Sequence, residues 1–379
     1  MTFFAFQNGR LALGESLIDG QTLLVSGGRI EAIGPDLAIP TGYHRVDLNG
    51  DILAPGFVDI QVNGGGGALF NDAPSVETIT TIARAHAKFG TTALLPTLIS
   101  DDLEKIALAI EAVDAAIEAE VPGVLGIHLE GPFLNTSRKG VHDASKFKVL
   151  DQEAIELLTR LKHGKTLITL APETAPPGAI AELVRRGAVV FAGHTEASYE
   201  QIIAAEAEGL RGFTHIFNAM SQLVSRAPGV VGAALSSPTS FSGLIADGVH
   251  VHVANMALVA RLLGPKRTVL VSDAMPTLGS DQDWFELKGE KIFARGLTCY
   301  TPDGVLAGSN LSLHDAMGVM MDQVGIGLTD ALQMASHAPA RAIGLEGQVG
   351  RLAVGARADF VQLDGDSNLV RVWQRGVQL

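Results

Sequence analysis

The feature that most constrains the fold of this chain is a repeated alternation of short apolar runs with stretches of helical periodicity. Runs of four to six mostly apolar residues recur through the central part of the chain, and the gaps at 76–89, 103–119 and 199–208 have apolar residues at helical spacing. Strands and helices that alternate in this way form parallel sheets. The eight predicted strands are residues 56–61, 92–95, 124–129, 167–170, 188–192, 212–215, 243–246 and 268–272.

Eight consecutive strand–helix units predict an α/β fold, namely a (β/α)8 TIM-type barrel. A doubly wound open sheet has the same local pattern, and periodicity alone does not separate the two folds. The chain ends differ, because their short apolar runs are separated by turn signals, which is typical of antiparallel strands. We therefore expect a small β-sandwich domain built from both termini, residues 1–52 and 345–379, and a barrel domain of residues 53–344.

The charge of the chain limits its partners. A net charge of -13 and a pI near 5.3 argue against nucleic acid and against an anionic membrane surface, and an anionic substrate would need local cations. The start of the chain lacks a signal-peptide pattern, and no apolar run reaches the roughly 18 residues of a membrane span, so we expect a cytoplasmic protein. Cys299 is the single cysteine, which excludes an intramolecular disulfide and a thiolate metal cluster.

Polar residues that can bind metals follow four of the predicted strands. They are Glu130, His194, His215 and Asp273, and a barrel gathers the carboxyl ends of its strands at one mouth. A single histidine after an apolar strand is more often a hydrogen-bonded structural residue than a metal ligand. Four metal-competent residues at equivalent positions favour a metal site instead. Two imidazoles and one carboxylate suffice for a catalytic ion, and the remaining carboxylate can act as a general base. His128 shares a strand face with Glu130, and we expect it to support or pack against this site.

The run at residues 63–67, Asn-Gly-Gly-Gly-Gly, is a weak signal for nucleotide binding. No Gly-Lys-Ser/Thr follows it, and the spacing of a phosphate-binding fingerprint is missing. We expect a tightly turned loop at the barrel mouth instead.

Five segments carry a more specific pattern: residues 55–64 (PGFVDIQVNG), 128–133 (HLEGPF), 193–195 (GHT), 214–220 (THIFNAM) and 271–274 (VSDA). In order and in motif they resemble the N-acetylglucosamine-6-phosphate deacetylases of the amidohydrolase superfamily. The resemblance extends to residues 350–359, which are similar to the part of that superfamily's small β-sandwich that the C-terminus supplies. It therefore covers nearly the whole chain.

The resemblance implies a catalytic centre at the strand ends. Glu130, His194 and His215 would bind the metal, and Asp273 would be the base that takes a proton from the ion's water and returns it to the leaving amine. His142 would stabilise the oxyanion together with the ion. The implied sugar and phosphate contacts are Val141, His142, Asn218, Ala219, Arg226, Asp247, His250, Leu306, Ala307 and Gly308.

Two of these residues are the cations that an anionic substrate requires. Arg226 and His250 can each contact a phosphate, and the forked donors of a guanidinium suit it well. The resemblance also implies that Arg226 reaches the site of a neighbouring subunit. We therefore expect a homo-oligomer, either a dimer or a tetramer.

The chain departs from many amidohydrolases at the end of the first barrel strand. A His-x-His pair commonly holds another metal there, whereas this chain has Gln61 and Asn63. Neutral amides are poor ligands for soft or borderline divalent ions. We therefore expect one divalent ion per chain, with zinc as the expected metal. Some members of the family keep the histidines and bind two ions.

The implied reaction is hydrolysis of N-acetylglucosamine 6-phosphate to glucosamine 6-phosphate and acetate, in amino-sugar catabolism. The alternative is the same reaction on N-acetylgalactosamine 6-phosphate, which the sequence does not separate from the first. Gln61, Asn63 and Glu130 argue against a ring-opening cyclic amidohydrolase with a carboxylated lysine. A catalytically inactive binding protein is disfavoured because all four strand-end residues are present.

Overall fold

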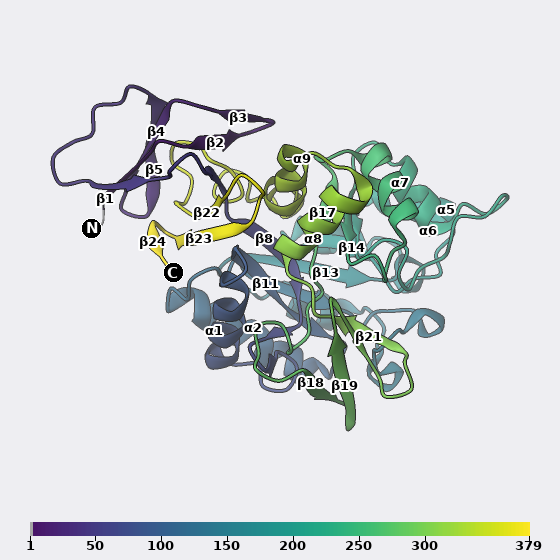
Figure 1. Ribbon diagram of the computed structural model, residues 1–379. Helices are drawn as coiled ribbons and strands as arrows, with labels where there is room; N and C mark the ends of the chain where they lie inside the picture. Colours follow the sequence, from purple (N-terminus) through teal and green to yellow (C-terminus); the bar gives the residue numbers. More distant parts are fainter. Residues whose placement is uncertain (1–2) are drawn as a thin grey trace.

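Eight parallel strands form the centre of the molecule, and each is hydrogen-bonded to the next one along the chain (Figure 1). The computed structural model describes residues 3–379. All eight predicted strands overlap an observed one, so this part of the prediction is confirmed. The strands are β8 (Phe57–Val62), β11 (Thr91–Ile99), β12 (Gly126–Glu130), β13 (Lys165–Leu170), β14 (Val189–Ala192), β15 (Gly212–Phe213), β16 (Phe241–Leu244) and β17 (Thr268–Leu270).

The sheet closes on itself through the segment that follows β17. Val62, the last residue of β8, pairs in parallel with Ala274. The backbone N–H groups of Asn63 and Gly64 both donate to the carbonyl of Ala274, at 3.1 and 2.9 Å. The fold is therefore a nearly closed barrel, as predicted, and the doubly wound open sheet is excluded.

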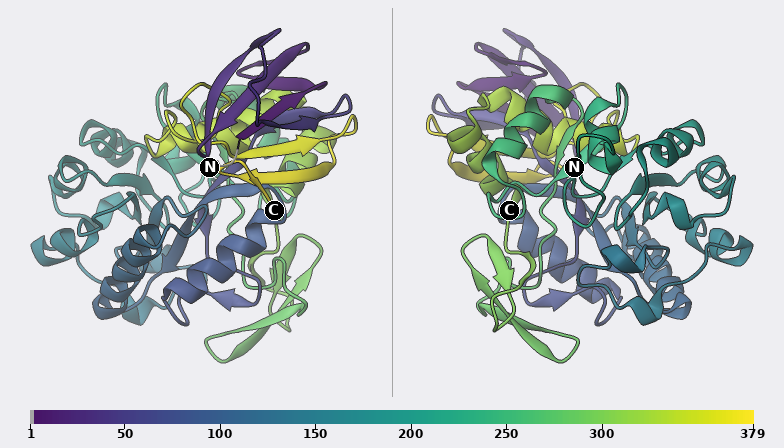
Figure 2. Two further views of the ribbon diagram at one scale, coloured as in Figure 1. Left: turned by 90° about the vertical axis from the view of Figure 1, so that its left-hand side faces the viewer. Right: turned by 90° about the vertical axis from the view of Figure 1, so that its right-hand side faces the viewer.

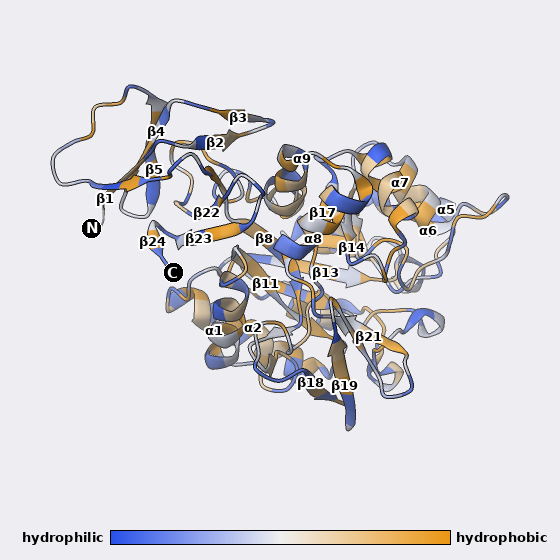
Figure 3. Cartoon of the chain, viewed as in Figure 1, coloured by the Kyte–Doolittle hydropathy of each residue, from blue (hydrophilic) through white to orange (hydrophobic). Residues whose placement is uncertain are grey.

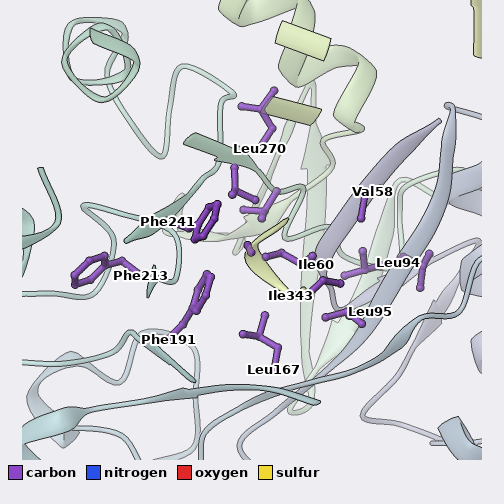
Figure 4. Close-up of a cluster of buried hydrophobic side chains, with 14 of the residues drawn as sticks. Val58, Ile60, Leu94, Leu95, Leu167, Phe191, Phe213, Phe241, Leu270 and Ile343 are labelled. Carbon is purple, nitrogen blue, oxygen red and sulfur yellow. The ribbon is translucent and has the colours of Figure 1, made fainter. Parts of the chain in front are cut away.

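The side chains inside the barrel are large and apolar. In Figure 4, Ile60, Leu167, Phe191 and Phe241 point toward a common centre. Ile343, which follows the last helix, is also fully buried in this core. The barrel is thus a packed core, which leaves its rim as the place for a site.

Helices surround the barrel (Figure 2), and their orange and blue segments in Figure 3 reflect one buried and one solvated face. The Ser75 hydroxyl accepts from the Thr78 N–H and starts the first helix. None of the helices in residues 3–379 is long and apolar enough to cross a membrane. The helices are α1 (Val76–Ala87), α2 (Leu103–Glu118), α3 (Gln152–Leu158), α4 (Ala179–Arg185), α5 (Tyr199–Ala207), α6 (Gly229–Ser236), α7 (Val253–Leu263), α8 (Leu313–Val319), α9 (Leu328–Leu332) and α10 (Ala338–Ala342), with π-helical turns at Met320–Val324 and Gln333–His337.

Both chain ends contribute to the sheets beside the barrel, which confirms the expected association of the termini (Figure 2). Phe6 packs edge-on against Phe360 and Trp373, each with ring centroids 5.3 Å apart, so residues from both ends share one core. One sheet has the order β5-β4-β1-β6 and the other β24-β23-β22-β7-β2-β3. Their strands are β1 (Phe3–Gln7), β2 (Arg10–Leu13), β3 (Ser16–Ile18), β4 (Gln21–Ser26), β5 (Arg29–Pro35), β6 (His44–Asp47), β7 (Ile52–Pro55), β22 (Phe360–Leu363), β23 (Leu369–Gln374) and β24 (Val377–Gln378).

A four-stranded antiparallel sheet, which was not predicted from the sequence, follows the last barrel strand. Phe285, Ile292, Cys299 and Ala307 from this sheet form a small core with Met275. The buried position of Cys299 agrees with a packing role. The strands are β18 (Trp284–Leu287), β19 (Glu290–Arg295), β20 (Thr298–Tyr300) and β21 (Leu306–Ser309).

The glycine run after β8 forms a tight two-stranded turn, as predicted. Strand β9 (Gly64–Gly65) pairs with β10 (Ala68–Leu69), and the turn residues Gly66 and Gly67 have positive φ of 62° and 84°. A Cβ on Gly64 would lie 2.5 Å from the carbonyl oxygen of Ala68. The run is therefore required by the close approach of the backbone at the barrel rim.

Candidate active site

Three of the predicted ligands come from three strand ends and meet at one point of the barrel mouth. Glu130 ends β12, and His194 and His215 lie just beyond β14 and β15. Nε2 of each histidine lies 3.0 Å from Oε1 of Glu130, and the two nitrogens lie 3.1 Å apart. All three side chains are buried, and within residues 3–379 they form the one cluster of this kind with ligand atoms within 4.8 Å of one another.

Unusual backbone conformations occur where these side chains leave their strands. His194, His215 and Asp273 have φ of 49°, 31° and 51°. Left-handed conformations cost a non-glycine residue on the order of 1–3 kcal/mol and persist only where surrounding contacts hold them. Such contacts are present, because the N–H of Asp273 donates to Gln61 and the carbonyl of His194 accepts from Asn135. The backbone strain is therefore concentrated at the barrel rim. There it sets the direction in which these side chains leave their strands.

The protonation pattern of this cluster fits a bound divalent cation. Nδ1 of His194 lies 2.8 Å from the carbonyl oxygen of Arg138, so Nδ1 carries the proton of the neutral ring and Nε2 presents a lone pair. That lone pair faces a carboxylate oxygen of Glu130, so two hydrogen-bond acceptors lie opposite each other with no proton between them. A cation would satisfy both atoms together with Nε2 of His215. Ligand atoms around a tetrahedral zinc-type ion lie about 3.3 Å apart, close to the spacing found here.

The charges of the cluster are strongly coupled. Burial opposes ionisation of Glu130, but the imidazoles of His194 and His215, whose Nε2 atoms lie within hydrogen-bond distance of Oε1, hold the pKa of its carboxyl well below the usual range. Burial also acts against protonation of His215, yet the hydrogen bond and the charge of Glu130 leave the pKa of this imidazole raised. The carboxylate is therefore ionised, as a metal ligand must be.

His128 lies below this cluster and does not point into it. Its Nδ1 lies 3.1 Å from the Thr97 hydroxyl and its Nε2 lies 2.8 Å from the Thr169 hydroxyl. Burial lowers the pKa of His128 to about 4. It is a neutral, hydrogen-bonded core residue, in agreement with the supporting or packing role expected from the sequence.

Asp273 lies beside the cluster with one oxygen held by two amides. Oδ1 accepts from Nδ2 of Asn63 at 2.6 Å and from Nε2 of Gln61 at 3.1 Å. Burial and the nearby charge of Glu130 raise the pKa of Asp273 to about 6. A carboxyl group with a pKa near neutrality is suited to accept a proton and return it.

His142 reaches the cluster from the loop after β12. Its Nε2 lies 3.9 Å from Oε1 of Glu130, and its ring centroid is 4.4 Å from that of His194. Burial, followed by the charge of His194, holds the pKa of His142 well below the usual range. The imidazole is therefore neutral and can offer an uncharged N–H to the space above the cluster.

The cluster opens into a pocket of about 210 Å³. Two predicted contacts lie just outside its lining: Oδ2 of Asp247 holds Nδ1 of His250 at 2.5 Å, and Ala307 is buried within β21. The predicted residues that line the pocket are Glu130, Val141, His142, His194, His215, Asn218, Ala219, His250, Asp273, Leu306 and Gly308.

Arg226 is the third predicted contact that does not line the pocket of its own chain. It lies on the exposed loop that precedes α6, between Val224 and Ala227, which pair with each other (Figure 1). Within residues 3–379, neither a lysine nor an arginine lines the pocket. An anionic group in this pocket would therefore face no guanidinium of the same chain.

Five lining residues are absent from the predicted contacts: Asn63, Ile99, Gly140, Ile245 and Met275. Four of them have no polar side chain and therefore give no chemical signal in a sequence. Asn63 is different, because it follows a barrel strand just as the predicted ligands do. Its position was a usable signal for a site residue.

Comparisons with known proteins agree with this geometry. Residues 52–378 match the model of the Amidohydrolase family. The N-acetylgalactosamine-6-phosphate deacetylase of Shewanella sp. (strain ANA-3) is 42% identical over 329 residues, which cover 87% of this chain and 83% of that protein. The crystal structure of N-acetylglucosamine-6-phosphate deacetylase from Pasteurella multocida has a TM-score of 0.94 at 33% identity, covering 100% of this chain and 99% of that one.

A second solved structure contains a ligand. A mutant of the N-acetyl-D-glucosamine-6-phosphate deacetylase from Mycobacterium smegmatis, in complex with N-acetyl-D-glucosamine 6-phosphate, has a TM-score of 0.87 at 30% identity. The match covers 100% of this chain and 99% of that one. The family match spans the whole barrel and the Glu130, His194 and His215 cluster lies at the barrel mouth, so this chain belongs to the amidohydrolase family.

Proposed function

We propose that this protein is a metal-dependent deacetylase of N-acetylhexosamine 6-phosphates. It would add water across the amide bond, so that acetate and the amino sugar phosphate are released. The observation that carries the proposal is the buried cluster of Glu130, His194 and His215 with Asp273 beside it at the floor of one pocket. The similarity over the whole chain to deacetylases that act on such substrates supports it.

In this proposal each side chain has a separate task. A divalent ion, with zinc expected, would be held by Glu130, His194 and His215 and would acidify a water and polarise the acetyl carbonyl. Asp273 takes a proton from the attacking water while the oxygen of that water bonds to the acetyl carbon. The Nε2–H of His142 donates to the carbonyl oxygen as negative charge develops there. Asp273 then returns the proton to the amine nitrogen as the C–N bond breaks.

The rest of the pocket would orient the sugar. Asn218, Ala219, Leu306 and Gly308 line the pocket around the cluster, and Asp247 fixes the ring of His250. Contacts far from the amide contribute by holding the acetyl group in position rather than by polarising it. These residues are therefore proposed as sugar and phosphate contacts.

We also propose that a second copy of the chain completes the phosphate site. The exposed position of Arg226 and the lack of a lysine or arginine in the pocket lining of residues 3–379 support this idea. A phosphate dianion is best matched by the forked donors of a guanidinium. The protein would then be a homo-oligomer, a dimer or a tetramer, in which Arg226 serves the neighbouring site.

Between the two epimers, the comparisons favour the galacto substrate, which is the alternative that the sequence leaves open. The N-acetylgalactosamine-6-phosphate deacetylase of Shewanella is 42% identical to this chain, whereas the N-acetylglucosamine-6-phosphate deacetylase from Pasteurella multocida is 33% identical. We therefore propose N-acetylgalactosamine 6-phosphate as the preferred substrate and N-acetylglucosamine 6-phosphate as the second candidate.

Acetate release from the two epimers, measured side by side with the zinc-loaded protein, tests this function. We expect turnover of both, with the higher kcat/KM for the galacto epimer. A higher value for the gluco epimer would reverse the order of the two substrates. No acetate from either one, with the ion present, would contradict the deacetylase proposal itself.

A further inference from the structure

One neutral amide lies between the two carboxylates of the site, and a second one contacts Asp273 alone. Nε2 of Gln61 lies 3.1 Å from Oδ1 of Asp273 and 3.2 Å from Oε2 of Glu130. The NH₂ group of Gln61 therefore has one hydrogen for each carboxylate. Nδ2 of Asn63 makes the shorter contact, 2.6 Å from the same Oδ1 of Asp273.

The carboxylates determine which way these amides face. Gln61 and Asn63 are 2% and 4% exposed, so water does not offer alternative partners. Oδ1 of Asn63 has no hydrogen-bond partner in the described chain. Rotating the Asn63 amide by half a turn would bring that oxygen against a carboxylate oxygen of Asp273, so only the observed orientation is favourable.

The two donors act on one oxygen of Asp273 and leave the other one open. Within residues 3–379, Oδ2 of Asp273 has no hydrogen bond, while Asp273 itself lines the pocket. A carboxylate that turns freely about its last torsion exchanges its two oxygens. Two N–H donors on one oxygen prevent that exchange and keep the other oxygen toward the reacting atoms.

We propose that Gln61 and Asn63 are positioning residues for Asp273, and that they hold Oδ1 so that Oδ2 is the oxygen that exchanges the proton. This inference rests on the proposed function. The positions that hold histidines in many amidohydrolases would thus orient the base through neutral hydrogen-bond donors. No second ion is needed for that task.

The test replaces each amide by an apolar side chain of similar size. In Gln61→Met and Asn63→Leu the donors are lost, and we expect kcat to fall about 10- to 100-fold while KM changes little, because a misplaced catalytic group costs rate rather than affinity. Zinc content should stay at the wild-type level in both variants. Crystal structures of the two variants should show the Asp273 carboxylate rotated or in two orientations.

A matched control comes from the sheet of the chain ends. Gln362 is 1% exposed and donates to Oδ2 of Asp51 at 2.6 Å, so it is also a buried amide bonded to a carboxylate. It lies outside the pocket. Gln362→Met should lower Tm at least as much as Asn63→Leu does, yet leave kcat unchanged. That result would separate positioning from a general loss of stability.

A double-mutant cycle with Asp273→Asn tests whether the amides act through Asp273. If they do, adding Asn63→Leu to Asp273→Asn should change the residual kcat by less than about 2-fold, because the group that Asn63 positions is already disabled. A further loss as large as that in the wild-type background would overturn the inference. Wild-type kcat in both single variants, with an active wild-type enzyme, would overturn it as well.

Failure of the inference is distinguishable from failure of the proposed function. If the wild-type protein releases no acetate, the proposed function is wrong, and the crystal structures of the variants still report the orientation of Asp273. If the wild-type protein is active and the Asp273 carboxylate keeps its orientation in Asn63→Leu and Gln61→Met, only the positioning role is wrong.

Discussion

The hydroxyl oxygen of Ser100 lies 2.7 Å from Nδ1 of His142, and the backbone N–H of Ser100 donates to the same nitrogen at 3.3 Å. A backbone N–H can only donate, so Nδ1 of His142 accepts and the neutral ring carries its proton on Nε2. Nε2 is the nitrogen nearer to Glu130. Ser100, which directly follows β11, therefore selects the tautomer that offers an N–H to the pocket.

This tautomer predicts different outcomes for two substitutions of His142. The amide of glutamine can extend an N–H to about the position of Nε2, whereas asparagine is too short and matches only the Nδ1 side. Loss of one donor to a developing oxyanion typically lowers kcat by about 10²- to 10³-fold. We expect that full loss for His142→Asn and a smaller one for His142→Gln, measured as acetate release. A more active asparagine variant would contradict the assigned tautomer.

Metal content is the second prediction. We expect about one divalent ion per chain after gel filtration, because Gln61 and Asn63 are poor ligands for a second one. A chelator should abolish turnover, and added zinc should restore it. Tm should also fall on chelation, since the ion binds only the folded chain. Elemental analysis provides the measurement, and two tightly held equivalents per chain would refute the expectation.

Substitutions should separate the ligands from the base. His194→Asn and His215→Asn each remove one of three protein ligands, so the purified variants should contain little metal. Asp273→Asn should keep its ion and its KM but lose about 10²- to 10⁴-fold in kcat, the usual range for general acid–base catalysis. If Asp273→Asn emptied the site as the histidine variants do, Asp273 would be a ligand rather than the base.

The barrel and the ligand cluster could be predicted because both depend on local patterns. Each barrel strand is an apolar run between turn signals, and Glu130, His194, His215 and Asp273 each come at or just after the end of one. In a barrel, residues that follow the ends of successive strands lie close together at the same mouth. The four residues therefore needed no long-range information to be grouped.

The sheet of β18 to β21 was missed although part of its signal is present. Lys288 and Gly289 have φ of 55° and 80° and connect β18 to β19, a two-residue turn between apolar runs of the kind that favours a hairpin. Its position over the site was not predictable, because it depends on packing between Met275 and Phe285. The pocket contacts of Leu306 and Gly308 came from the family resemblance, since neither residue carries a chemical signal.

The sequence pattern could not settle the role of Arg226 either. The proposed phosphate contact of Arg226 leads to a fourth prediction. Arg226→Ala should raise KM for the 6-phosphorylated substrate but hardly change activity on the unphosphorylated N-acetylhexosamine. A guanidinium–phosphate contact contributes about 1.5–3 kcal/mol, and it disappears when the phosphate is absent. Arg160→Ala, another exposed arginine outside the pocket, is the control. Equal losses on both substrates would mean that Arg226 is structural.

The last prediction concerns the strand that carries Glu130. Gly126 starts β12, and a Cβ there would lie 1.9 Å from the carbonyl oxygen of Lys165 on the neighbouring strand β13. Gly126→Ala must push these strands apart, so we expect a loss of at least about 2 kcal/mol in stability. Gly318 of α8 has open space at its Cβ, and Gly318→Ala should stabilise by about 0.4–1 kcal/mol. Thermal unfolding measures both changes, and a Gly126→Ala protein with wild-type Tm would contradict the close contact.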